Sequence, residues 1–185
     1  TPSANQVGNA IVSFTASDNG SPILSDTKTV AINVSAAGCV AAPTGLVSWY
    51  RAEGTANDAL GNHNGTLVNG VSFGAGRVGQ AFTFDGIDDT IELGTWFNLQ
   101  TFTLAMWVKP NEPQTTYANI IDNNHTDFRA WVLQQNVNVL NQYTWGIAGI
   151  QPVIALNLTT DTWNYVALTL NANRVTNVYV NGVQV

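Results

Sequence analysis

In the segment FTLAMWVKP, residues 102–110, the apolar residues Phe102, Leu104, Met106 and Val108 alternate with Thr103, Ala105 and Trp107. Every second residue from Phe102 to Val108 is apolar and falls on one side of an extended chain, whereas Trp107 falls on the other side. This period of two predicts a β-strand with one face against a core, and Pro110 marks its end. The pattern leaves open which face is the inward one, because Trp107 is itself apolar.

Short segments of the same kind continue in both directions from this strand. They are separated by Asn, Gly, Asp and Pro, and none shows the 3.6-residue spacing of an amphipathic helix. The expected strands lie within residues 45–51, 65–70, 81–86, 90–94, 118–123, 128–135, 144–150, 153–158, 163–171 and 175–180. Many short strands with turn residues between them predict an all-β fold, an antiparallel sandwich of two sheets.

Residues 1–36 are expected to form a separate unit. Two alternating apolar stretches flank a loop at residues 18–26 that contains Gly and Pro, which predicts a β-hairpin. A lone two-stranded hairpin is marginally stable in water, so we expect this one to close a domain whose earlier strands precede the chain. Residues 37–44 are small and contain Gly and Pro, which predicts a linker before a second domain at 45–185.

The end of the second domain carries another hairpin signal. Asn181 and Gly182 form the dipeptide typical of a type I′ turn, but only three residues follow it. A strand without its partner exposes unpaired backbone groups. We therefore expect the second domain to be truncated at its C-terminus and the chain to be a fragment that works beside other domains of the same polypeptide.

The motifs of residues 45–94, followed by FTLAMWVKP, WNYVALTLN and NVYVNG, resemble the laminin-G-like domains of the concanavalin A-like lectin/glucanase jellyroll family. The resemblance covers residues 45–185. It implies two stacked antiparallel sheets, used mostly for binding carbohydrate or protein and often carrying a structural calcium ion. Residues 14–34 resemble the last two strands of cadherin-like and bacterial immunoglobulin-like repeats. In this stretch we expect Asp18 to shape a turn.

The composition excludes several classes of partner. Only 10% of residues are charged and the net charge is −6, whereas nucleic acid and anionic membranes require a cationic surface. No apolar run of about 18 residues exists, so we expect no membrane insertion. The single cysteine, Cys39, allows no internal disulfide. Solubility that depends on neutral polar residues is typical of a secreted β-rich module, and we expect an extracellular location.

Three carboxylates crowd the short connection at residues 85–89, and an Asn/Asp/Gly-rich loop at residues 54–65 resembles it in composition. Calcium takes six to eight oxygen ligands, and such loops supply them. Asp and Asn also cap turns through local hydrogen bonds without a metal. Both interpretations stay open. The candidate calcium ligands are Asp85, Asp88, Asp89, Asp58 and Glu53.

The chain contains six Trp and five Tyr, and flat aromatic rings pack against the C–H faces of sugars. The segment NQYTWG places two rings on one side of a strand with amides nearby, a mixture typical of ligand sites. A second segment places Trp and Arg on one side. The candidate ligand-binding residues are Tyr143, Trp145, Trp131 and Arg129. The alternative is that these rings form the core, as we expect for Trp49 and Trp163.

The sequence gives no support for an enzyme. Glycoside hydrolysis requires two carboxylates at a fixed separation, but Glu53, Glu92 and Glu112 are scattered. His63 and His125 lie in Asn-rich loops, and no G-x-S-x-G motif is present. We therefore predict a non-catalytic extracellular recognition or adhesion module. A glycan is the favoured ligand. The alternatives are protein–protein adhesion or a purely structural spacer, and after these a part of a glycoside hydrolase.

Overall fold

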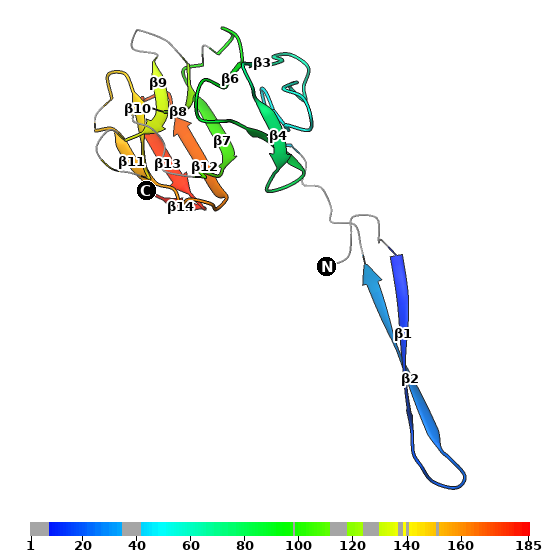
Figure 1. Cartoon of the computed structure of the whole chain (residues 1–185). Coiled ribbons are helices and arrows are strands. Elements are labelled where there is room, and N and C mark those ends of the chain that lie inside the picture. The colour runs from blue at the N-terminus through cyan, green and yellow to red at the C-terminus, as the bar shows by residue number, and fades with distance from the viewer. Residues whose placement is uncertain are drawn as a thin grey trace. The chain divides into compact units, whose positions relative to one another are not determined.

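The computed structural model describes residues 8–34, 42–97, 99–111, 118–123, 130–136, 139, 141–150 and 152–185. The chain divides into two compact units, residues 1–46 and 47–185. All the regular secondary structure in the described residues is β-strand, so the predicted all-β class is confirmed (Figure 1). Within the described part of the chain there is no helix that could cross a membrane.

The first unit contains one long hairpin. Strands β1 (Gly8–Ser17) and β2 (Ser25–Val34) pair antiparallel along their whole length. Oδ1 of Asp18 accepts hydrogen bonds from the backbone N–H groups of Leu24 (2.9 Å) and Gly20 (3.0 Å), and these bonds hold the pKa of Asp18 below its usual value. The predicted hairpin and the turn-forming role of Asp18 are confirmed.

The hairpin has no core of its own. Ile11 and Phe14 on β1 are 73% and 62% exposed, and Val30 on β2 is 49% exposed. A two-stranded ribbon has two open faces and can bury neither without a further layer. That it closes an immunoglobulin-like or cadherin-like domain stays a prediction.

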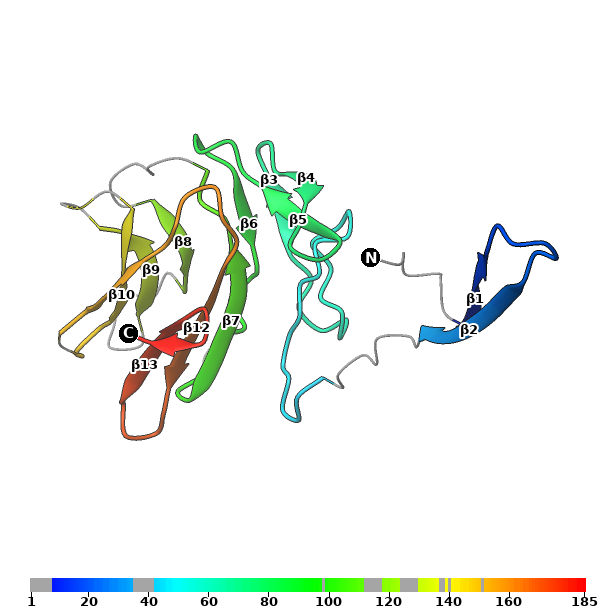
Figure 2. The ribbon, with the colours of Figure 1, turned by 90° about the horizontal axis from the view of Figure 1, so that it is seen from below.

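The second unit is built on two four-stranded antiparallel sheets that lie face to face (Figure 2). One sheet has the order β11–β10–β9–β8, and the other has the order β14–β13–β12–β7. The first sheet comprises β8 (Asn119–Asp122), β9 (Trp131–Gln135), β10 (Gln142–Ile147) and β11 (Ile154–Asn157). The second comprises β7 (Phe102–Val108), β12 (Asn164–Leu170), β13 (Thr176–Val180) and β14 (Val183–Gln184).

Two short ladders lie beside β7 (Figure 2). Strand β3 (Thr66–Val68) pairs with β6 (Thr90–Glu92), and β4 (Ser72–Ala75) pairs with β5 (Gln80–Thr83). Each ladder is antiparallel. The loop between β5 and β6 contains Asp85, Asp88 and Asp89, and residues 76–79 form the turn between β4 and β5.

The core fills the space between the two four-stranded sheets. Trp145 of β10 is 1% exposed, and its indole N–H donates to the Thr176 hydroxyl of β13 across 2.7 Å, which joins the sheets. The apolar face of β7 packs against this core, so Trp107 points outward. The predicted antiparallel two-sheet sandwich is confirmed. The buried core residues are Trp131, Leu133, Tyr143, Trp145, Ile147, Leu156, Leu158, Val166, Leu168, Leu170 and Val178.

The turn between β13 and β14 has the backbone that its sequence predicts. Asn181 and Gly182 both have positive φ angles, 51° and 83°, as a type I′ turn requires. The side-chain oxygen of Asn181 also accepts a hydrogen bond from the Tyr165 N–H across 2.9 Å. This bond fastens the turn to β12 next to the outward ring of Tyr165.

Candidate functional site

Three of the four residues predicted to bind a ligand lie in the core. Trp131, Tyr143 and Trp145 are 5%, 1% and 1% exposed, so a sugar-binding surface at these rings is wrong. The physical reason is that β9 and β10 turn their aromatic sides toward the other sheet, where the rings gain more from burial than from contact with solvent. Burial also raises the pKa of Tyr143. Arg129 lies outside the described residues.

The exposed aromatic rings of the second sheet lie on its opposite, solvent-facing side. Trp107 on β7 and Tyr165 on β12 are directly paired across the strands and are 45% and 37% exposed. Their ring centroids are 5.2 Å apart, with the ring planes inclined at 56°. Because the two rings project from paired strands, each one restricts the side-chain rotamers of the other. Together they form an apolar surface of restricted mobility.

This surface continues onto β13. Tyr179 projects on the same side, diagonally from Tyr165, and its strand partner is Ala167. Ala167 in turn faces Ala105 on β7, so small side chains separate the aromatic ones. We call this set, which comprises Trp107, Tyr165, Tyr179, Ala105 and Ala167, the outer aromatic face. The two alanine side chains are too small to cover the three rings, so ring surface stays exposed to solvent.

Polar groups border the outer aromatic face. The side-chain N–H of Gln184 on β14 donates to the side-chain oxygen of Asn177 on β13 across 3.1 Å. From the other side, the guanidinium carbon of Arg77 lies 5.4 Å from the ring centroid of Trp107, within the range of a cation–π contact. Rings flanked by amides and a guanidinium are suited to a ligand that has both C–H and O–H surfaces.

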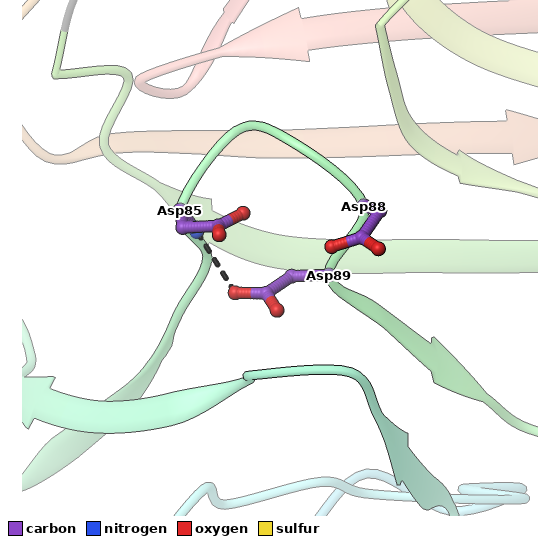
Figure 3. A group of neighbouring side chains, drawn as sticks. All are labelled: Asp85, Asp88 and Asp89. Carbon is purple, nitrogen blue, oxygen red and sulfur yellow. Dashed lines mark hydrogen bonds between the residues drawn. The ribbon is translucent and has the colours of Figure 1, made fainter.

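The acidic cluster lies in the loop between β5 and β6 (Figure 3). Carboxylate oxygens of Asp85, Asp88 and Asp89 all lie within 4.8 Å of one another. Asp89 holds the loop, because its two oxygens accept the N–H of Gly70 (2.5 Å) and of Asp85 (2.9 Å). The local spacing in the sequence therefore does bring these three predicted ligands together.

Oδ1 of Asp85 accepts the Ile87 N–H across 2.8 Å, which closes a local turn. The exposed carboxylate of Asp88 adds negative charge on the solvent side. Oxygens that share one calcium ion lie up to about 5 Å apart, twice the usual Ca–O distance. The three carboxylates therefore fit one coordination sphere, in which carbonyls and water would supply the remaining ligands.

The other two predicted calcium ligands serve different parts of the fold. The Asp58 side chain is fully buried, and its oxygens accept backbone N–H groups, including those of Trp49 (2.8 Å) and His63 (3.2 Å). Oε1 of Glu53 accepts the Gln80 N–H across 3.2 Å at the turn between β4 and β5. Neither belongs to the acidic cluster, so a five-carboxylate site is wrong.

Burial by itself raises the pKa of Asp58, because it penalises the charged form. The N–H groups of Trp49, Leu60 and Asn62 outweigh burial and hold this pKa below its usual value. The carboxylate thus stays ionised and organises the loop of residues 54–65. An oxygen already bonded to several backbone donors is a poor partner for a cation.

The structure also corrects the expected position of Trp49. This ring is 46% exposed, and the guanidinium of Arg51 lies 4.1 Å from its centroid.

The sequence analysis did not predict the outer aromatic face as a binding surface. The alternation in residues 102–108 already separated Trp107 from the apolar side, and the same pattern in WNYVALTLN separates Tyr165 from Val166, but sequence alone gives no inward direction.

Comparison with known proteins identifies the family. The family model described as the concanavalin A-like lectin/glucanases superfamily matches residues 85–185, more than half of the chain. The chain belongs to this superfamily, as its motifs had indicated. Its members include both lectins and glycosidases, so membership fixes the fold class without fixing an activity.

A solved structure is similar in part. It is an S-layer domain-containing protein from Clostridium thermocellum, 26% identical in sequence, and the match covers 75% of this chain and 70% of that one with a TM-score of 0.43. The comparison with curated proteins found no match.

Proposed function

We propose that this chain is a non-catalytic, extracellular recognition module that binds carbohydrate through its outer aromatic face. The observation that carries the proposal is the exposed, cross-strand pair of Trp107 and Tyr165. Paired rings that already brace each other lose little side-chain entropy when a ligand packs on them. An extracellular location is supported by the composition, in which only 10% of residues are charged.

The chemistry of the sheet favours binding over catalysis. None of the strands β7, β12, β13 and β14 contains Asp or Glu, so no carboxylate projects from the sheet toward a sugar held on the face. Glycoside hydrolysis requires an acid and a base or nucleophile on either side of the scissile bond. The outer aromatic face supplies rings, hydroxyls and amides, which hold a sugar without activating it.

Replacing Trp107 with alanine is expected to abolish detectable binding to the glycan that the unmodified chain selects on a glycan array. We expect a loss of about thirtyfold or more in affinity, because a stacked ring at the centre of an interface is a typical hot spot. Titration calorimetry with that glycan measures the loss. The thermal midpoint should stay close to that of the unmodified protein, because Trp107 is 45% exposed.

Trp49→Ala is the matched control, because Trp49 is 46% exposed and lies outside the outer aromatic face. This variant should bind the glycan normally. Equal losses in the two variants would contradict the assignment of the face. Silence of the unmodified chain across a broad array, together with binding to an extracellular protein that free sugars do not inhibit, would favour the protein-adhesion alternative.

We further infer that the acidic cluster of Asp85, Asp88 and Asp89 holds a structural calcium ion. A cation would relieve the repulsion of three carboxylates whose oxygens lie within 4.8 Å. Calcium at about 100 times its dissociation constant is expected to add about 2.7 kcal/mol to the free energy of unfolding. Thermal melting with calcium and with EGTA measures this gain.

Asp88→Asn should remove the calcium-dependent shift, because it removes one charge and leaves in place the bonds that Asp85 and Asp89 make within the loop. Asp161→Asn is the control, since it removes a carboxylate from a turn elsewhere and Asn tolerates the positive φ of 56°. A midpoint that calcium leaves unchanged after verified metal removal would refute the metal site.

A further inference from the structure

We propose that Arg77 is a specificity-determining residue, which donates hydrogen bonds to hydroxyl pairs of a neutral glycan stacked on Trp107. This inference rests on the proposed carbohydrate-binding function and deepens it. It assigns to the turn between β4 and β5 a binding role that neither the family nor the sequence motifs assign. Three features carry it: the placement of Arg77, its lack of a carboxylate partner and the charge of the surrounding surface.

The turn between β4 and β5 holds Arg77 in a defined place. The Gly76 N–H donates to the Gly79 carbonyl across 2.9 Å, which closes the turn tightly. A Cβ at Gly76 would lie 2.5 Å from the Gln80 carbonyl oxygen, and Gly79 has a φ of +60°, so both positions favour glycine. Arg77 is therefore presented at the tip of a constrained turn, next to Trp107 of the neighbouring sheet.

Arg77 has no carboxylate partner among the described residues. Lys28 pairs with Asp26, and the Asp58 carboxylate lies 3.7 Å from Nδ1 of His63; neither contact involves Arg77, although the chain has 12 acidic residues and only six Lys and Arg. Glu53 lies close to the turn, but its carboxylate accepts the Gln80 N–H. A surface guanidinium left without a carboxylate, at the border of exposed rings, has donors to offer a ligand.

The charge of the surface indicates a neutral ligand. Strands β7, β12, β13 and β14 contain neither acidic nor basic residues, so the outer aromatic face is uncharged. The net charge of −6 repels an acidic polymer, and one guanidinium is too small a cationic footprint to overcome that repulsion. A planar guanidinium offers parallel donors that fit two adjacent hydroxyl oxygens, while the rings cover the C–H face of the same sugar.

The test compares Arg77→Ala with Arg51→Ala. Both arginines contact an exposed Trp ring, at 5.4 Å and 4.1 Å from its centroid, but Arg51 does so away from the outer aromatic face. Titrations use cellopentaose, xylopentaose and mannopentaose as neutral probes and a glucuronate pentamer as the acidic one, each at low and high salt. Arg77→Ala should weaken binding of the best neutral probe about tenfold, and Arg51→Ala should leave it unchanged.

Arg77→Lys keeps the charge but loses the planar fork, so its affinity should resemble that of Arg77→Ala. The neutral affinity should also be independent of salt. If a neutral probe binds, Trp107→Ala abolishes that binding and Arg77→Ala still behaves like Arg51→Ala, the role of Arg77 is wrong while the proposed function stands. Tighter, salt-sensitive binding of the glucuronate pentamer would overturn the neutral class. No binding of any probe or arrayed glycan would overturn both proposals.

Discussion

Trp145→Ala is expected to lower the free energy of unfolding of the sandwich by about 3 to 5 kcal/mol, the usual range for truncating a buried Trp. The ring is 1% exposed and lies against Trp131 and Phe102, with centroid distances of 5.6 Å and 6.5 Å. Truncation would leave a cavity at the centre of the core and break the bond to the Thr176 hydroxyl that joins the sheets. Urea denaturation followed by circular dichroism measures the loss.

Two variants make this result specific. Trp107→Ala makes the same chemical change on the exposed side of the second sheet and should cost less than about 1 kcal/mol. Trp145→Phe keeps most of the apolar ring and loses the N–H, so its cost should lie between those of the two alanine variants. A Trp145→Ala protein that keeps its stability but loses glycan binding would restore the surface interpretation of this ring.

The contrast between Trp145 and Trp107 shows how far the sequence could predict the fold. The alternation of residues 102–108 was sufficient for a strand, and ten further segments of the same kind were sufficient for an antiparallel sandwich. It was harder to predict from the sequence which face of each strand points toward the core. Residues 142–147 place Tyr143 and Trp145 opposite polar or small residues, which is also the pattern of a core face, but the neighbouring amides suggested a ligand site.

The candidate site shows the same difference between contacts within a short segment, which the sequence predicts, and contacts between segments far apart in the sequence, which it does not. Asp85, Asp88 and Asp89 lie within five residues, so their proximity followed from the sequence. The contact of Arg77 with Trp107 joins a turn to a strand of another sheet, and no local pattern specifies how a hairpin packs against that sheet. The loop around Asp58 is rich in Asn, Asp and Gly, and for this reason the sequence predicted Asp58 as a calcium ligand together with the acidic cluster. In the structure the Asp58 carboxylate is buried instead.

Asp58→Ala is expected to lower the free energy of unfolding by about 3 kcal/mol or more, because it strands buried backbone donors. The side chain is fully buried, and its oxygens accept N–H groups of Trp49, Leu60, Asn62 and His63 over 2.8 to 3.3 Å. Each donor left without a partner costs about 1 to 3 kcal/mol if water cannot reach it. Denaturant unfolding at neutral pH measures the loss.

The same network predicts a dependence on pH. The pKa of Asp58 is lower in the folded chain than its usual value of 3.8, so folding favours the charged form. The stabilisation is therefore fully present above the unfolded-state pKa, near pH 4, and is lost as the pH falls through the folded pKa. Asp58→Asn keeps the shape but cannot titrate, and it should be less stable than the unmodified chain at neutral pH. The difference in free energy of unfolding between the unmodified chain and Asp58→Asn should become smaller in acid, because protonation of Asp58 removes the same charge. A gap that stays constant from pH 7 to pH 2 would show that the charge of Asp58 does not stabilise this loop.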